Sequence, residues 1–321
     1  MNHTSIPWGG QRGSVVTVGT FDGVHLGHWA ILREIAIRAK RDHRRSVLVT
    51  FDPHPLEIVN PEAAPRLLTV GDEQLEILAQ GELDLVVFLP FTKLLSQYSP
   101  EAFVRLLIDR FQMEELVIGH DHGFGRARSG DETILRELGE KLGFVVDLVG
   151  AVAVGNRLVS STLVRRAVAG GDLKTAEELL GRPYSITAPV IRGMARGRKL
   201  GYRTINLEIT NPRKLLPPNG VYAVRAEWRN GAADGIMHQG PRPTFGERDR
   251  TLEIHLFDVD VELYNVPVKV SWLSRLRDII SFPDTKALEA QLKIDLKAAK
   301  SALTASHGAT TNQRSQSSGS W

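Results

Sequence analysis

A stretch rich in glycine and histidine near the amino terminus carries the residues best suited to chemistry. It reads VGTFDGVHLGHWAIL over 18–32, beginning like a buried strand and ending like an amphipathic helix. A glycine-rich turn between a strand and a helix can bring backbone N–H groups close to a phosphate, and the positive end of the helix adds to the attraction. Alternatively, the segment is a tight turn in which His25 and His28 cap the helix or face solvent. We expect no zinc site here, because no further metal ligand accompanies the pair.

The pattern of apolar residues predicts the elements that position this turn. From 14 to about 150, short apolar runs alternate with segments of helical period, which indicates a parallel sheet with crossover helices. Short helices are expected after Ser161 and Asp172, and Gly181 and Pro183 mark a break. Beyond this break, β-branched segments of alternating character separated by Gly, Pro and Asn predict a small antiparallel barrel.

Two domains are predicted from the length of 321 residues and from this change of pattern. The first, 14–182, is an α/β domain, and the second, 183–304, is a β-barrel followed by a closing helix. The segment 305–321 is polar and low in complexity, so we predict a disordered tail.

Composition narrows the class of protein. Lys and Arg number 40 against 37 Asp and Glu, without a long basic block, so we expect small anionic ligands and no nucleic acid. The absence of cysteine excludes disulfides, thiolate metal sites and a cysteine nucleophile. No signal segment and no run of eighteen apolar residues is present, so we expect a soluble cytoplasmic protein that binds no membrane.

The whole string GTFDGVHLGH resembles the nucleotidyltransferase signature of the bifunctional riboflavin kinase/FAD synthetase family. Similar family blocks follow in order: TFDPHP, PFTKLLSQYSPEAFV, VIGHDHGFGRARSGD and VSSTLVRRAVAGGDL. The later stretches GRKLGYRTINL, LPPNGVYAV, GPRPTFG, LEIHLFD and LSRLRD resemble the riboflavin kinase half. The resemblance covers roughly 14–300 and implies a Rossmann-like nucleotidyltransferase domain before a kinase barrel. It also implies an enzyme that uses ATP, with Mg²⁺ as the cofactor, to phosphorylate riboflavin to FMN and then to adenylylate FMN to FAD.

For adenylyl transfer, the resemblance implies that His25 and His28 are catalytic and act on the ATP phosphates. The other residues that it assigns to ATP are Gly19, Phe21, Gly27, Ser161, Thr162 and Arg165. The residues that it assigns to the nucleotide or flavin cleft are Asp22, Phe51, His54 and Asp121. Taken alone, the triplet Ser160, Ser161 and Thr162 indicates a helix cap, and Phe51 is more typical of a core residue. His122 and Gly123 depart from the family's usual pattern.

For riboflavin phosphorylation, the resemblance implies that Glu253 is the catalytic base and that Thr204 and Asn206 hold the Mg-nucleotide. From its position alone, Glu253 is more typical of an exposed glutamate in a strand. Strand alternation turns its neighbours Leu252 and Ile254 away from it, and we predict His255 on the other face. The resemblance also assigns Gly193, Gly197 and Gly201 to a loop over the phosphates. It assigns Arg277 to the flavin, and the alternative for Arg277 is a solvated arginine at the start of a helix.

Three residues depart from the family's kinase motifs, namely Arg203, Ile205 and His238. Because the motifs of both halves are present in order, the leading hypothesis is still a bifunctional enzyme. An FAD synthetase with an impaired kinase and a flavin-binding regulatory protein stay as alternatives. The sequence indicates no oligomeric state.

Overall fold

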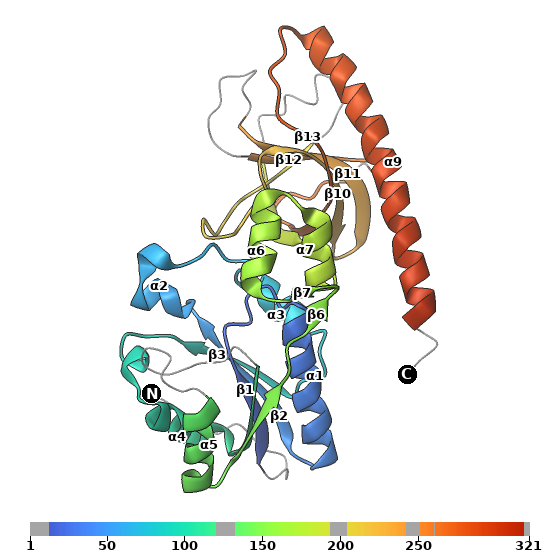
Figure 1. Cartoon of the computed structure of the whole chain (residues 1–321). Helices are drawn as coiled ribbons and strands as arrows, with labels where there is room; N and C mark the ends of the chain where they lie inside the picture. The colour runs from blue at the N-terminus through green and yellow to red at the C-terminus, as the bar shows by residue number, and fades with distance from the viewer. Residues whose placement is uncertain (1–12, 120–131, 193–203, 242–250, 260, 318–321) are drawn as a thin grey trace. The chain divides into compact units, whose positions relative to one another are not determined.

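The computed structural model describes residues 13–119, 132–192, 204–241, 251–259 and 261–317, and side chains are described up to residue 304 (Figure 1). The chain divides into two units, one formed by 1–67 with 74–161 and the other by 68–73 with 162–321. The sequence places the domain boundary later, at Arg182. The difference arises because α7 (Leu173–Leu180) packs against β13 (Pro267–Arg277) of the second unit.

A five-stranded parallel sheet forms the centre of the first unit, as the alternating pattern predicts. Its order is β3-β2-β1-β4-β5, so the direction of the crossovers reverses between β1 and β4. Open α/β sheets bind ligands at this point, beyond the carboxyl ends of the strands. The strands are β1 (Ser14–Val18), β2 (Arg45–Asp52), β3 (Leu85–Pro90), β4 (Met113–Gly119) and β5 (Val145–Val149).

Both faces of the sheet are covered by helices. Helix α1 (Leu26–Arg41) and the end of α3 (Asp72–Leu78) pack with Val15 of β1, whereas α4 (Pro100–Phe111) and α5 (Glu132–Leu142) pack on the opposite side. Alternation along β1 produces this arrangement, since successive side chains enter the two apolar clusters in turn. The remaining short elements of this part are α2 (Pro55–Val59), η1 (Pro61–Ala63), η2 (Leu95–Gln97), β6 (Ala153–Val154) and β7 (Arg157–Leu158).

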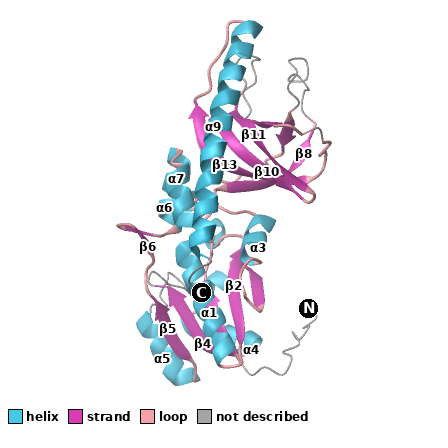
Figure 2. Ribbon diagram, turned by 90° about the vertical axis from the view of Figure 1, so that its right-hand side faces the viewer, coloured by secondary structure: helices cyan, strands magenta, loops and turns pink. Residues whose placement is uncertain are grey.

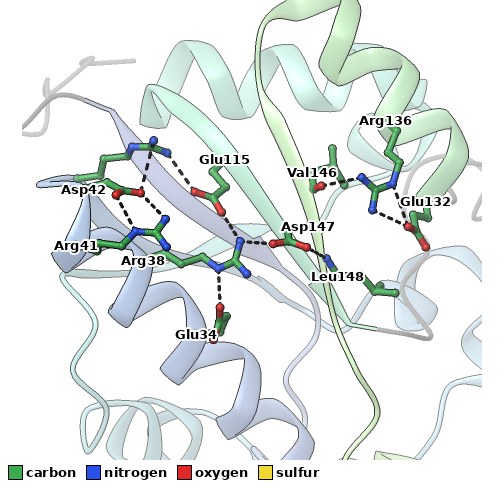
Figure 3. A network of polar contacts seen from close by, with 11 residues as sticks. Glu34, Arg38, Arg41, Asp42, Glu115, Glu132, Arg136, Val146, Asp147 and Leu148 are labelled. Atoms are coloured by element: carbon green, nitrogen blue, oxygen red, sulfur yellow. Dashed lines mark hydrogen bonds and ion pairs between the residues drawn. The ribbon is translucent and has the colours of Figure 1, made fainter.

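The carboxyl-terminal half of α1 is fastened to the sheet by a charged network around Arg38 (Figure 3). Its guanidinium ion-pairs with Glu34 at 2.7 Å and Glu115 at 2.6 Å, and it also contacts Asp147 of β5. Burial opposes the charged form, yet the carboxylates that accept its hydrogen bonds raise the pKa of Arg38 above its ordinary value. Burial likewise opposes ionisation of Asp147, but the hydrogen bond from Arg38 lowers the pKa of Asp147.

Two short helices precede the barrel, at the places that the sequence predicts. Helix α6 covers Ser161–Gly170, and Asp172 caps α7 by accepting a hydrogen bond from the Thr175 N–H at 3.0 Å. Gly181 ends α7 with φ 73°, a left-handed conformation that glycine adopts without a steric penalty.

A closed antiparallel barrel of six strands forms the second unit, which confirms the predicted architecture (Figure 2). Around the barrel the order is β10-β11-β12-β9-β8-β13. The strands other than β13 are β8 (Ser185–Ile191), β9 (Ile205–Leu207), β10 (Gly220–Trp228), β11 (Gly231–Gly240) and β12 (Thr251–Leu256). Among the described helices of the chain, none is long and apolar enough to cross a membrane.

Helix α9 (Thr285–Ser317) lies along the barrel, where Ala299 and Leu303 pack against β10 and β11 (Figure 2). The predicted closing helix is therefore present. It continues through most of the segment that the sequence predicts to be disordered, so the structure differs from that prediction. Once a helix has formed, each added residue contributes another hydrogen bond, and residues 305–317 contain no proline to interrupt it.

A buried ion pair holds the segment 68–73 in the second unit. Lys214 Nζ lies 2.6 Å from Glu73 Oε2, and the two side chains are 1% and 7% exposed. Lys214 also donates hydrogen bonds to the carbonyls of Leu68 and Ser185. The other Glu73 oxygen accepts a hydrogen bond from the Thr187 N–H of β8 at 2.9 Å. Because the charges are paired and hydrogen-bonded, their burial is tolerated.

Candidate active sites

The glycine-rich turn directly follows the carboxyl end of β1, which is the end of the strands where open α/β sheets bind ligands. Phe21 has φ 47° and Val24 has φ 38°, although neither residue is a glycine. A β-branched residue such as Val24 rarely adopts this left-handed conformation. Such backbone strain persists only where the surrounding structure enforces it, and it often marks a functional site.

Side chains from three other parts of the chain hold the carbonyl groups of this turn. The Thr20 carbonyl accepts hydrogen bonds from Thr50 Oγ1 at 3.0 Å and Gln74 Nε2 at 2.9 Å. Gln74 Nε2 also donates to the Phe21 carbonyl at 3.2 Å. Ser161 Oγ donates to the Asp22 carbonyl at 2.9 Å. The strained conformation is therefore fixed by contacts distant in sequence.

The two histidines cap α1 reciprocally. The His28 N–H donates to His25 Nδ1, and the His25 N–H donates to His28 Nδ1, both at 3.3 Å. Each Nδ1 therefore acts as an acceptor, so this hydrogen-bond pattern assigns the proton of each neutral imidazole to Nε2. An Nε2–H group is a donor for an anion such as a phosphate. The cap and the phosphate-binding role, which are alternatives in the sequence, are thus compatible.

The histidine rings are stacked, with their centroids 3.6 Å apart and their planes 13° apart. Gly27 permits this packing, because a Cβ atom added there would lie 3.2 Å from His25 Nδ1. The first turn of α1 contains no acidic residue that would offset the positive end of the helix. The arrangement therefore combines two imidazole donors with a helix amino terminus, which suits a negatively charged ligand.

The other residues predicted for this site have more varied environments. The Phe21 ring is 2% exposed and packs into the apolar cluster beneath α1, with its centroid 4.5 Å from that of His28. Phe51 packs at the margin of the opposite cluster against Phe103. His54 caps α2 by accepting a hydrogen bond from the Leu56 N–H at 3.2 Å.

Further predicted residues lie on α6 or at the beginning of the turn. Thr162 and Arg165 are three positions apart on α6, so their side chains lie on neighbouring parts of its surface. Gly19 follows β1, and its N–H donates to the Val49 carbonyl at 3.1 Å. Asp22 is buried. The predicted residue Asp121, with the divergent His122 and Gly123, lies outside the described residues.

A second candidate site lies in the barrel, where three strands place polar residues side by side. In the strand register, Glu253 of β12 stands opposite Asn206 of β9 and His238 of β11. Directly opposed residues share one face of a sheet. Thr204 Oγ1 donates a hydrogen bond to Glu253 Oε1 at 2.7 Å. Hydroxyl, amide and carboxylate oxygens therefore gather here, and this donor set suits a hard cation such as Mg²⁺.

The predicted position of His255 is wrong. Leu252, Ile254 and Leu256 are buried, whereas Glu253 and His255 are both partly exposed. Residues two apart in a strand point to the same face, so His255 shares the face of Glu253.

Arg277 is engaged with α9 instead of opening a helix. It is the last residue of β13, and its Nε and Nη2 atoms lie 2.9 Å and 2.6 Å from the two oxygens of Asp295. This paired interaction ties the barrel to α9, and the flavin role of Arg277 stays a prediction. The helix-start alternative is wrong because the residue is in a strand. Gly193, Gly197, Gly201 and Arg203 lie outside the described residues.

The sequence analysis missed Gln74 and Thr50, both of which support the histidine turn. In α3, the buried residues Glu73 and Gln74 share a face with Ile77 and Leu78, one turn further along. Polar residues on the apolar face of a helix were the available signal, since buried polar groups are normally hydrogen-bonded. Nothing in the local pattern identifies their partners.

Two family models match consecutive parts of the chain. The model described as FAD synthetase matches residues 9–163, and the model described as riboflavin kinase matches residues 180–303. The first match contains the histidine turn, and the second contains the row formed by Asn206, Glu253 and His238.

Relatives that match along most of their length combine riboflavin kinase and FMN adenylyltransferase in one chain. A bifunctional riboflavin kinase/FMN adenylyltransferase from Pseudomonas fluorescens is 36% identical, covering 90% of this chain and 93% of the relative. One of the same description from Buchnera aphidicola is 33% identical, covering 89% of this chain and 93% of the relative. A solved structure of a macrolide-efflux protein from Streptococcus pneumoniae has a TM-score of 0.81 at 29% identity, covering 92% of this chain and 96% of that one.

Proposed function

Because the chain belongs to the family of bifunctional riboflavin kinases/FMN adenylyltransferases, we propose that its two candidate sites divide that chemistry between them. The enzyme phosphorylates riboflavin to FMN and adenylylates FMN to FAD, with ATP as the donor in both reactions. Adenylyl transfer is assigned to the domain 14–182, and phosphorylation to the domain 183–304. The observation that carries this assignment is the reciprocal histidine cap in the first half, matched by the Glu253 row in the second.

In adenylyl transfer, a phosphate oxygen of FMN forms a bond to the α-phosphorus of ATP, and the bond to the leaving pyrophosphate breaks. Such a displacement depends on alignment and on charge stabilisation. His25 and His28 donate their Nε2 protons in hydrogen bonds to the phosphates, next to the amino terminus of α1. Ser161, Thr162 and Arg165 bind the triphosphate. A well-aimed donor of this kind typically contributes about 2.7–4 kcal/mol to the barrier reduction.

In phosphorylation, the terminal hydroxyl oxygen of riboflavin forms a bond to the γ-phosphorus of a second ATP, and ADP leaves. Glu253 accepts the hydroxyl proton, while the hydrogen bond from Thr204 fixes the orientation of its carboxylate. Enzymes of this ATP-dependent kind use a divalent metal, and we infer Mg²⁺ because Thr204 and Asn206 offer hard oxygen ligands. The metal supplies charge neutralisation at the phosphates when it is bound.

One arrangement favours a second candidate, an FAD synthetase with an impaired kinase. His238, which replaces the family's usual asparagine, stands opposite Glu253 in the strand register. A histidine beside the base changes both the shape and the charge of the site.

A time course distinguishes these functions. The full chain is incubated with riboflavin, ATP and Mg²⁺, and FMN and FAD are separated at intervals. We expect FMN to appear first and FAD to follow. Conversion of supplied FMN without any conversion of riboflavin would establish the monofunctional synthetase. Flavin binding without either product would favour a regulatory protein and contradict the proposal.

A further inference from the structure

Gln74 joins α3 to the histidine turn through one buried amide. Its Nε2 atom donates to the Thr20 carbonyl at 2.9 Å and the Phe21 carbonyl at 3.2 Å. Both partners are acceptors, so the amino end of the amide must face them, and its two protons serve the two bonds. The side chain belongs to the buried face of α3.

These bonds act at the strained part of the turn. Phe21, whose carbonyl accepts from Gln74, has φ 47°, and Val24 has φ 38° immediately before His25. Without enforcing contacts, a non-glycine residue relaxes out of this left-handed region, because its side chain clashes with the backbone there. Relaxation at Phe21 or Val24 would move His25, the residue that begins the reciprocal cap. Gln74 therefore bears on the geometry of the histidines through the backbone of the turn.

We propose that Gln74 is a positioning residue for adenylyl transfer, acting through the backbone of residues 20 and 21. This proposal rests on the proposed site at His25 and His28. Thr50 has a related role, because its hydroxyl donates to the same Thr20 carbonyl at 3.0 Å. Small displacements of catalytic groups are costly, since reaction requires aligned near-attack geometry.

The test compares Gln74→Met and Gln74→Glu in the full chain. Methionine keeps the length without a donor, and glutamate keeps the shape but places an acceptor against two carbonyls. We expect kcat for adenylylation of FMN to fall by about tenfold or more, with the larger loss for glutamate and little change in the KM for ATP. Riboflavin phosphorylation by the same preparation stays within about twofold of wild type. Gln80→Met and Gln80→Glu are the matched controls, because Gln80 is exposed just after α3.

Further variants keep the proposal testable if the Gln74 variants do not fold. Thr50→Val removes the other donor to the Thr20 carbonyl, and we expect a similar loss of kcat that Thr50→Ser restores. Wild-type kcat in folded Gln74 variants, with only a lower melting temperature, would overturn the positioning role. His28→Ala is measured in parallel. If His28→Ala lowers adenylylation while the Gln74 variants do not, this inference alone fails. If His28→Ala has no effect, the proposed histidine site fails with it.

Discussion

Thr204 Oγ1 lies 2.7 Å from Glu253 Oε1 and donates a hydrogen bond to it. Glu253 also stands opposite Asn206 across the β12–β9 pair, and Asn206 is only 8% exposed. Glu253, the proposed proton acceptor, thus lies beside Thr204 and Asn206, the proposed metal ligands, on one face of the barrel. This relationship connects residues 49 positions apart in the chain and gives the kinase proposal its geometry.

Glu253→Gln tests the proposed base. Glutamine keeps the size of the side chain but cannot accept the riboflavin proton, so we expect FMN formation to fall by about a hundredfold or more. Supplied FMN is still converted to FAD. Glu227→Gln is the matched control, because Glu227 is an exposed glutamate on β10 of the same barrel. FMN formation at the wild-type rate in Glu253→Gln would rule out Glu253 as the base.

His28→Ala tests the adenylyl-transfer site. The change removes one stacked ring and the acceptor for the His25 N–H. We expect FAD formation to fall by at least about tenfold, or roughly 1.4 kcal/mol of barrier, with riboflavin phosphorylation nearly unchanged. Rates of both reactions and the melting temperature are measured on one preparation. His43→Asn is the control, since His43 is exposed and its φ of 53° suits asparagine. Equal loss of both activities would indicate unfolding instead.

Lys214→Met tests the buried ion pair. The substitution leaves the Glu73 carboxylate buried without its cation, so we expect the free energy of unfolding to fall by about 3–5 kcal/mol. Urea unfolding measures the effect. Adding Glu73→Gln to Lys214→Met removes the uncompensated charge and recovers part of the loss. Lys174→Met, at an exposed position of α7, is the matched control. An equal loss in Lys174→Met, or no recovery in the double variant, contradicts this account.

Asp147→Asn tests the network around Arg38 through its pH dependence. The pKa of Asp147 is lowered in the folded state from its ordinary value of 3.8, so its stabilisation is fully present above pH 3.8 and is lost as the pH falls through the folded-state pKa. The carboxylate is 41% exposed, so solvent screening limits the effect to about 1 kcal/mol or less. We compare urea midpoints of wild type and Asp147→Asn from neutral to acidic pH. The difference is expected to shrink below pH 3.8, whereas a constant difference excludes ionisation as its cause.

The sequence by itself determined the type and order of the main elements. Alternating apolar runs and helical segments identify the parallel sheet, and the later β-branched pattern identifies the barrel. Local chemistry also located helix limits, including the Asp172 cap and the left-handed Gly181. These features are predictable because the side-chain period and the capping groups act within a few residues of one another. The histidine cap is equally local, although its reciprocal form appears only in three dimensions.

The tertiary structure alone decided which distant residues meet. Gln74 reaches the Thr20 carbonyl across 54 positions, and Lys214 reaches Glu73 across 141. Arg277, which the resemblance assigns to the flavin, is paired with Asp295 of α9, 18 positions further along the chain. A sequence period specifies that a polar residue is buried, but not which partner satisfies it. That choice depends on strand order, barrel register and the packing of helices, because these bring distant parts of the chain within hydrogen-bond distance.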